Sequence, residues 1–259
     1  MKKYYRNGLF TVAIACLSIV CISNFSKQAT AETIKPIHNS NAMKGFALLE
    51  LFTSEGCSSC LPADELMAKV KAEGHNNLFI LAYHVDYWNR LGWKDVFSKP
   101  EWSARQRDYA SHLFTEGVYT PQLIVNGKVE FVGSNETKLR SVLEKKNTNT
   151  DIELAIGVIK KTENVVQISF QTPKNDNAIL NIALVQQDAI TQVKRGENAG
   201  HQLHHVNIVR DLKTIELNNG NGSININIPN ELVGTHFSVI GFVQQKKDFS
   251  IIAAAKADL

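Results

Sequence analysis

Cysteine is scarce in this sequence: 259 residues contain only four. A chain of this length can bury a sufficient core without disulfide support, so a scaffold held together by disulfides is not indicated. Long apolar runs are also lacking, because no segment beyond the first residues is long and apolar enough to cross a membrane. Internal repeats and low-complexity segments are absent too. The length of the chain indicates one large globular domain or two small ones.

The first residues have the organisation of a secretory signal peptide. A basic start is followed by an apolar stretch from residue 9 to 22, and small residues around Ala31 make a cleavage site. We therefore predict a signal peptide over 1–31 and export to the periplasm or the extracellular space. An uncleaved anchor and a lipid-anchored form are the alternatives.

A strong charge of one sign is missing once this peptide is removed. The full chain has 28 basic and 25 acidic residues, and cleavage takes away four basic and no acidic ones. The remaining 24 against 25 give a net charge of −1, which favours neither nucleic acid nor an anionic membrane as a partner. Cleavage also removes Cys16 and Cys21, so that only Cys57 and Cys60 meet the oxidising compartment.

Two apolar runs and the segment between them predict a β-α-β unit. Residues 45–53 and 78–88 are short, nearly continuous apolar runs, typical of strands buried on both faces. The segment from about 58 to 73 is helical in composition, and Gly74 is a natural stop. Two strands joined through one helix are expected to be parallel.

A longer connection than this fold needs follows, over residues 87–118. It contains all three tryptophans and an amphipathic helix that starts at Pro100. We expect an insertion that either walls the site or forms a small core of its own. Asn126-Gly127 then predicts a hairpin, residues 135–146 a closing helix and residues 147–150 a polar linker.

The pattern changes from residue 151 onward. Apolar residues alternate with polar ones, and clusters of asparagine and glycine separate the runs. This predicts about seven strands in an antiparallel, sandwich-like arrangement. The predicted organisation is therefore an α/β domain at 32–150, with its insertion at 87–118, and an all-β domain at 151–259.

Cys57-Ser58-Ser59-Cys60 lies between the first strand and its helix. A CxxC pair beside a β-α-β pattern in an exported chain is the redox motif of thioredoxin-like folds. Free backbone N–H groups at a helix start would stabilise the thiolate of Cys57, and Cys60 could resolve a mixed disulfide. Pro62 complicates this arrangement, because either the first turn is distorted or the regular helix begins near Pro62.

Thr120-Pro121 is the second part of the predicted site. A proline that opens an interior strand is unusual because it donates no hydrogen bond to the sheet. The segment "YTPQLIVNG" resembles the one that places a cis-proline opposite the dithiol in thioredoxin-like folds. We predict a cis bond at Pro121; an ordinary trans-proline at a strand start is the alternative.

Histidines raise the question of a metal. His84 and Asp86 share a face near the end of the second strand, so Cys57, Cys60 and His84 could bind copper or zinc. The alternative for His84 is a packed or hydrogen-bonded residue that assists proton transfer. A further group, His201, His204 and His205, is interpreted mainly as part of a loop that packs against the first domain.

Long motifs carry a resemblance to a known family. The segments "ELFTSEGCSSCLPAD", "AYHVDYWNRLGWKDVFS", "VYTPQLIVNG" and "RGENAGHQLHHVNIVR" lie within residues 46–210. Together they resemble a bacterial family of secreted, thioredoxin-like proteins of unknown function. By position, the resemblance implies a site made of Cys57, Cys60 and Pro121, with His84, Asp86, Trp88 and Trp93 nearby.

Three functional hypotheses follow. The first is an exported thiol–disulfide oxidoreductase that needs no cofactor and acts on protein thiols or disulfides together with a separate redox partner. In it Cys57 reacts, Cys60 resolves, and Thr120 and Pro121 hold the partner chain. The second is a copper or zinc metallochaperone that uses the two cysteines and His84. The third is a non-catalytic binding module with a residual dithiol.

Overall fold

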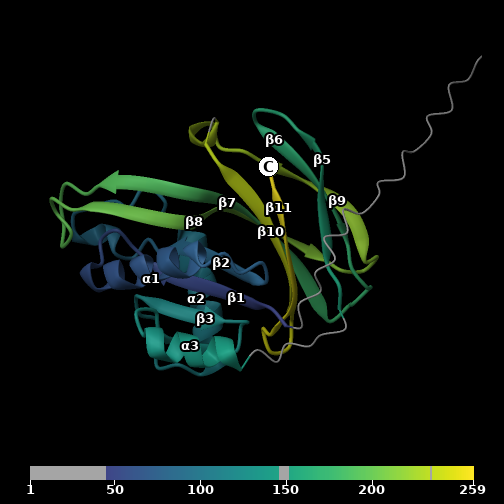
Figure 1. The fold of residues 1–259 in the computed structure, drawn as a ribbon, viewed down its shortest axis with the longest axis horizontal. Coiled ribbons are helices and arrows are strands. Elements are labelled where there is room, and N and C mark those ends of the chain that lie inside the picture. The colour runs from purple at the N-terminus through teal and green to yellow at the C-terminus, as the bar shows by residue number, and fades with distance from the viewer. Residues whose placement is uncertain (1–44, 146–151, 234) are drawn as a thin grey trace, which may run out of the picture. The chain divides into compact units, whose positions relative to one another are not determined.

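A computed structural model describes residues 45–145, 152–233 and 235–259 (Figure 1). The predicted signal peptide at 1–31, the residues that follow it up to 44, and the predicted linker at 147–150 lie outside this described part. The predicted boundary between residues 150 and 151 lies outside it as well. The division into two domains therefore stays a prediction.

The first elements form the β-α-β unit that the sequence predicts. Strand β1 (Ala47–Thr53), helix α1 (Leu61–Ala72) and strand β2 (Leu78–His84) follow one another, and β1 and β2 pair in parallel. Every residue of β1 is buried, because side chains that alternate along the strand meet apolar partners on both faces of the sheet. The strand is thus buried on both faces, as predicted.

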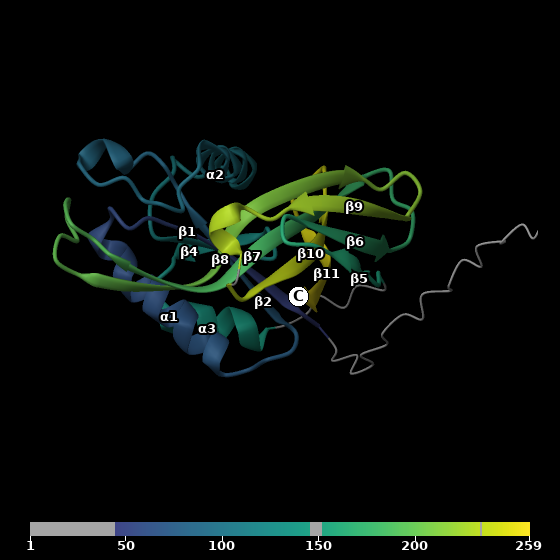
Figure 2. The same cartoon turned by 90° about the horizontal axis from the view of Figure 1, so that it is seen from above.

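Helices cover both faces of this part of the sheet. Helix α2 (Pro100–Leu113) lies on one face, while α1 and α3 (Glu136–Glu144) lie on the other (Figure 2). The helix predicted to start at Pro100 does start there. Trp102 and Tyr109 bring α2 into the apolar core on its face, and Leu139 and Leu143 bring α3 into the other.

A hairpin completes this edge of the sheet. Strands β3 (Gln122–Val125) and β4 (Val129–Val132) are antiparallel, and β3 also pairs with β1. Asn126 and Gly127 in the turn both have positive φ, 49° and 70°, as the predicted Asn-Gly turn requires.

Seven further strands follow along the chain. Three short 3₁₀ segments, η1, η2 and η3, lie in the connections of the described residues. The strands are β5 (Ala155–Lys161), β6 (Val165–Gln171), β7 (Ala178–Gln192), β8 (Gln202–Glu216), β9 (Asn221–Asn227), β10 (Phe237–Gln245) and β11 (Ile251–Asp258), and the 3₁₀ segments are Ser58–Cys60, Asn89–Leu91 and Asn230–Leu232.

The strands form one large mixed sheet and one small sheet. The large sheet has the order β11-β10-β7-β8-β2-β1-β3-β4, and the small one β5-β6-β9. Apolar side chains of β6 and β9 pack against β7 and β10, so residues 152–259 include two packed sheets. The protein is therefore β-rich, with a large mixed sheet and few helices.

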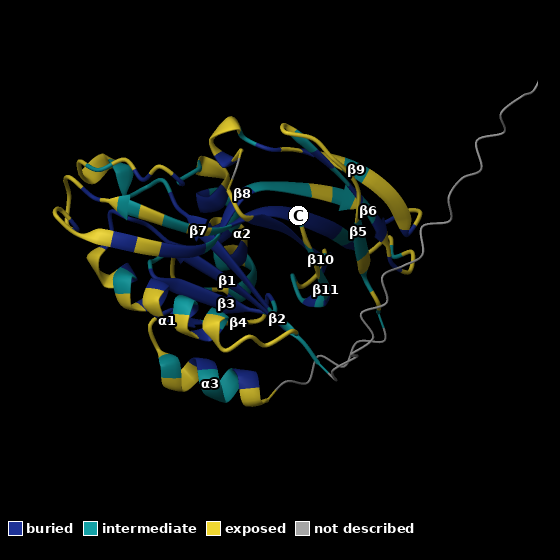
Figure 3. Ribbon diagram, turned by 45° about the horizontal axis from the view of Figure 1, so that its top comes forward, coloured by how far each residue is buried: buried dark blue, intermediate teal, exposed yellow. Residues whose placement is uncertain are grey.

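The predicted sandwich differs from the structure in one respect. One of its two sheets is not separate, because β8 lies in parallel beside β2 and continues the sheet of the first half, with Ala82 opposite Ile208. Figure 3 shows that the strands at this junction are buried. Near this junction, the loop between β7 and β8 contacts η1 and the segment of the two cysteines. These segments form the candidate site.

Candidate functional site around the Cys57–Cys60 disulfide

Cys57 and Cys60 form a disulfide at the end of β1, with their Cα atoms 5.4 Å apart. The chain leaves β1 at Thr53, makes the 3₁₀ turn Ser58–Cys60 and enters α1 at Leu61. Pro62 occupies the first turn of α1, where its missing N–H removes no helical hydrogen bond. Of the two arrangements predicted around Pro62, the regular helix that begins beside it is the one observed.

The Thr120–Pro121 segment lies against the disulfide. The Thr120 hydroxyl donates a hydrogen bond to Cys57 Sγ at 3.2 Å and accepts one from the indole N–H of Trp88 at 2.8 Å. The Thr120–Pro121 peptide bond is cis, as the sequence predicted. The hydroxyl of Ser59 is 3.3 Å from the same sulfur. Residues 63 positions apart in the sequence therefore meet at Cys57 Sγ.

The sequence predicts that backbone N–H groups at the helix start face Cys57 Sγ, but the N–H of Ser58 has another partner. Both the N–H and the hydroxyl of Ser58 donate to the carboxylate of Glu197, at 3.0 and 2.8 Å. The polar contacts observed at Cys57 Sγ come from the Ser59 and Thr120 hydroxyls instead. Hydrogen bonds of this kind stabilise a thiolate, although they carry no net charge.

The loop between β7 and β8 covers the disulfide segment. Asn198 is buried, and its side-chain NH₂ donates to the backbone carbonyls of Glu55 and Cys57, at 2.8 and 3.2 Å. Together with Glu197 it fixes the loop at 193–201 on the cysteines. Both cysteines are 0% exposed. A reagent therefore reaches the sulfur atoms only if one of the segments packed around them moves.

Behind the disulfide lies a buried group of ionisable side chains. His84 Nδ1 lies 2.7 Å from Asp95 Oδ2, and neither side chain is exposed. The backbone N–H of Glu55 donates to the same Asp95 oxygen at 2.8 Å, and Trp93 donates its indole N–H to Glu55 Oε2 at 2.7 Å. His84 and the N–H groups of Glu55 and Phe97 hold the pKa of Asp95 below its usual value despite burial.

His205 joins this group from β8. Its Nε2 is 3.5 Å from Glu55 Oε1 and its Nδ1 is 3.8 Å from Asp64 Oδ2, and its ring meets that of His84 at a centroid distance of 4.8 Å. Burial raises the pKa of Asp64 to about 7, against the lowering effects of His205 and of the Thr53 hydroxyl. The buried group therefore consists of Glu55, Asp64, His84, Asp95 and His205.

The predicted site residues are brought together only in part. Trp88 and Trp93 lie at the site, whereas Trp102 packs into the core on the face that α2 covers. Asp86 pairs with Ser103 rather than with His84, although their two-residue spacing predicted that they share a face.

His201 and His204 are exposed, and only His205 of that cluster is buried. The sequence signal for Glu55, Asp64 and Asp95 was weak, because acidic residues are common near helix starts and in loops.

The metal alternative has no arrangement to support it in the described part of the chain. Among those residues, no group of three or more histidines, cysteines, aspartates or glutamates is placed so that it could hold a metal ion. The two sulfur atoms that the alternative needs are joined to each other. His84 directs its Nδ1 to Asp95. The predicted set of Cys57, Cys60 and His84 therefore stays a prediction.

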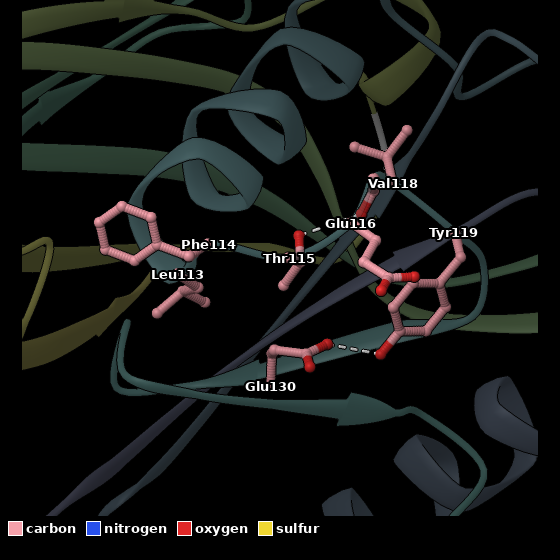
Figure 4. A pocket seen from close by; sticks show the side chains of 8 residues that line it. Leu113, Phe114, Thr115, Glu116, Val118, Tyr119 and Glu130 are labelled. Atoms are coloured by element: carbon pink, nitrogen blue, oxygen red, sulfur yellow. Dashed lines mark hydrogen bonds between the residues drawn. The ribbon is translucent and has the colours of Figure 1, made fainter.

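A shallow cavity of about 540 Å³ lies beside the Thr120 segment (Figure 4). Residues 113–119 and Glu130 line it, and the Tyr119 hydroxyl donates to Glu130 at 2.5 Å. Phe114 at its rim is 92% exposed. The cavity contains no cysteine or histidine, so the chemistry of the disulfide lies outside it.

The fold and site define a class of protein: a β-rich fold in which a CxxC disulfide is packed against a Thr-Pro segment. The chain belongs to the family described as Protein of unknown function (DUF1223), whose model matches residues 48–244. No curated protein matches the sequence. No helix in the described ranges is long and apolar enough to cross a membrane.

The sequence and fold are also similar to solved structures. The crystal structure of protein AGR_C_4864 from Agrobacterium tumefaciens is 26% identical in sequence, covers 83% of this chain and 95% of its own, and gives a TM-score of 0.62. A β-glucuronidase from Bacteroides uniformis matches 44% of this chain and 13% of its own at 8% identity. Its TM-score of 0.19 carries no argument.

Proposed function

We propose that this protein is an exported thiol–disulfide oxidoreductase whose first half is thioredoxin-like. The observation that carries the proposal is the contact between the two predicted parts of the site, in which the Thr120 hydroxyl donates to Cys57 Sγ at 3.2 Å. A structural disulfide across only two residues would stabilise the fold little, because it closes a very short loop. A reactive pair accounts better for a motif held against a separate segment of chain.

The two sulfur atoms have different surroundings, which supports different roles for them in the proposed reaction. Both cysteines are buried, but Cys57 Sγ is contacted by two hydroxyls, from Ser59 and Thr120, whereas Cys60 lies at the start of α1. An incoming thiolate attacks Cys57, a mixed disulfide forms, and Cys60 leaves with the electron pair of the broken S–S bond. In the opposite direction Cys60 attacks Cys57 and releases the partner as a thiol.

Export and partner class belong to the same proposal. A dithiol of this kind cycles between partner proteins, so it needs protein thiols or disulfides as substrates and a separate protein to restore its redox state. The predicted signal peptide supports a compartment in which disulfides persist.

Mixed-disulfide trapping tests this function. Reduced Cys60→Ser protein is mixed with insulin, and covalent adducts are measured by non-reducing electrophoresis and mass spectrometry. We expect an insulin adduct through Cys57, because the resolving thiol is absent. The matched Cys57→Ser variant should give no such adduct, and wild-type protein should reduce insulin with dithiothreitol as electron donor. The proposal would be contradicted if the wild-type protein did not reduce insulin and the Cys60→Ser variant formed no adduct at Cys57.

Burial of both cysteines adds a requirement, because the loop at 193–201 has to open before a partner can react. Asn198→Ala removes two hydrogen bonds to the cysteine segment, each worth about 1 kcal/mol. We expect reduction of the disulfide by a small thiol to become at least about tenfold faster, as measured by stopped-flow tryptophan fluorescence. Lys194→Ala, an exposed change in the same loop, is the control. Equal rates for wild type and Asn198→Ala would show that this loop is not the barrier.

A further inference from the structure

The loop at 193–201 has a fixed conformation and lies close against the site. The N–H of Gly200 donates to the Val193 carbonyl at 2.9 Å and closes the loop on itself. Gly196 and Gly200 have φ angles of 79° and 85°, which favour glycine. A side chain at Gly196 would also crowd Trp93, because a Cβ atom there would lie 3.3 Å from Trp93 Cβ. The loop is therefore shaped to pack on the segments around the disulfide.

Two residues of this loop hold the cysteine segment in different ways. Asn198 donates neutral hydrogen bonds to the backbone carbonyls of Glu55 and Cys57. Glu197 brings a carboxylate, which accepts hydrogen bonds from the N–H and the hydroxyl of Ser58 at 3.0 and 2.8 Å. Ser58 is bonded directly to Cys57, so this carboxylate lies next to the residue whose sulfur is attacked. A neutral acceptor could make the same two contacts, so the charge itself needs an explanation.

The side chain of Glu197 is an anion at neutral pH. The hydrogen bonds from Ser58 lower the pKa of Glu197 below its usual value. No basic side chain of the described residues contributes to this lowering. Lys194 and Arg195, in the same loop, are exposed. The negative charge beside the cysteine segment is therefore stabilised by the Ser58 hydrogen bonds rather than by a cation of the described part of the chain.

The charge on Cys57 changes during the proposed reaction. Both sulfur atoms are neutral in the disulfide. When glutathione is the reductant, its thiolate attacks Cys57 Sγ, and Cys60 leaves with the electron pair of the S–S bond and takes a proton from solvent. A second glutathione thiolate attacks the glutathione sulfur of the mixed disulfide, and Cys57 leaves as a thiolate. The products are the reduced protein and glutathione disulfide, and Cys57 then carries a negative charge near Glu197.

We propose that Glu197 is a positioning residue of this reaction, whose carboxylate holds the loop on the oxidised cysteines and opposes the negative charge that Cys57 acquires on reduction. The inference rests on the proposed oxidoreductase function. Two negative charges at short range disfavour each other. Reduction therefore weakens the attachment of the loop, and by linkage the attached loop favours the disulfide over the thiolate. The reduced protein thus offers Cys57 to a partner disulfide, whereas the oxidised protein keeps its sulfur atoms covered.

Glu197→Gln tests the charge, because glutamine keeps an oxygen that can accept from Ser58. The pKa of Cys57 in reduced full-length protein is measured from the pH dependence of its alkylation, assigned by mass spectrometry. The equilibrium with glutathione is measured over the same pH range. We expect the pKa of Cys57 to fall by at least about 0.5, and the equilibrium constant for reduction to rise at least about threefold above that pKa. Well below it the two proteins should agree, because both thiols are neutral.

The dependence on pH separates the charge from a merely structural role. Loss of loop packing alone would change the equilibrium constant by the same factor at every pH, whereas loss of the charge changes it only where Cys57 is ionised. Glu65→Gln, an exposed change of the same kind on α1, is the matched control and should keep both wild-type values. The other ionisable side chains around the cysteines are unchanged in these variants: Glu55, Asp64, His84, Asp95 and His205 of the buried group, and Lys194 and Arg195 of the loop.

Trypsin measures the attachment of the loop, because Lys194 and Arg195 are exposed in it. Oxidised protein, and reduced protein freed from reductant, are digested at a pH above the pKa of Cys57. We expect cleavage in the loop to be at least about fivefold faster for reduced wild type than for oxidised wild type. Glu197→Gln should show little dependence on redox state. Cleavage at Lys174, which is exposed between β6 and β7, is the internal control.

A Glu197→Gln protein with the wild-type pKa of Cys57 and the wild-type equilibrium constant overturns the role of the charge. Insulin reduction by the same wild-type sample then shows that the oxidoreductase function stands. Equal cleavage of the loop in oxidised and reduced wild type overturns the coupling between the loop and the redox state. Wild-type protein that fails the insulin and trapping tests overturns the function, and the inference falls with it.

Discussion

Arg105→Ala is expected to lower the free energy of unfolding by about 3–5 kcal/mol, because it leaves a buried carboxylate without its counter-charge. Glu50 lies in the middle of β1 and is 0% exposed. Arg105 Nε donates to Glu50 Oε1 at 2.8 Å, and the Tyr109 hydroxyl donates to the other oxygen. Both partners come from α2, so this ion pair attaches the helix to the central sheet.

Arg105 also connects α2 to the far part of the sheet. Its guanidinium lies 5.3 Å from the ring centroid of Phe242 and 3.4 Å from Gln244 Oε1, both in β10. The loss of these contacts adds to the cost of the unpaired charge. The Arg105→Ala variant is therefore expected to weaken the attachment of α2 to both halves of the large sheet.

Urea denaturation followed by circular dichroism measures this effect. Arg107→Ala, two residues further along the same helix and exposed, is the matched control and should change stability by less than about 0.5 kcal/mol. An Arg105→Ala protein within about 1 kcal/mol of wild type would show that Glu50 finds another partner or takes up a proton.

Local patterns in the sequence were sufficient to predict the elements around the disulfide. The apolar runs, the Asn-Gly turn and the helix start at Pro100 each depend on a few adjacent residues, and each predicted element is found. The second strand is shorter than the predicted 78–88, because it ends at His84. The Thr120–Pro121 contact with Cys57 was also predictable, because CxxC and a proline at a strand start form a known combination.

The ion pair and the buried group could not be predicted, because their partners are distant in sequence. Glu50 interrupts an apolar run without any local sign of Arg105, which lies 55 residues away. His205 reaches Glu55 and Asp64 only because β8 lies beside β2, and nothing in either strand identifies the other as its neighbour.

The loop at 193–201, which contacts the segment of the two cysteines, could not be predicted in full for the same reason. The spacing of Cys57 and Cys60 predicted a reactive dithiol, and the segment around His205 was predicted to pack against the first domain. The contacts made by Glu197 and Asn198 nevertheless depend on the length of the β7–β8 hairpin, with 15 residues in each strand. Strand length sets how far such a hairpin reaches, and alternating patterns predict strand ends poorly.

Asp64 is expected to make the stability of the protein depend on pH. Its pKa is about 7 in the folded state against an ordinary 3.8, so between these values the folded protein binds more protons than the unfolded chain. The free energy of unfolding therefore falls as pH rises from about 4 to about 7, by up to about 4 kcal/mol for this group, and then stays level. Burial of the carboxylate is the physical cause, and it outweighs the lowering effects of His205 and the Thr53 hydroxyl.

The contribution of Asp64 is isolated by comparison with Asp64→Asn, in which this side chain does not titrate. Urea denaturation of both proteins from pH 4 to 8 gives the difference in unfolding free energy at each pH. We expect the asparagine variant to gain stability relative to wild type as pH rises, with the change complete above pH 7, while Glu65→Gln shows no such trend. A difference that is flat across this range would mean that Asp64 ionises normally in the folded protein, because a partner compensates its burial.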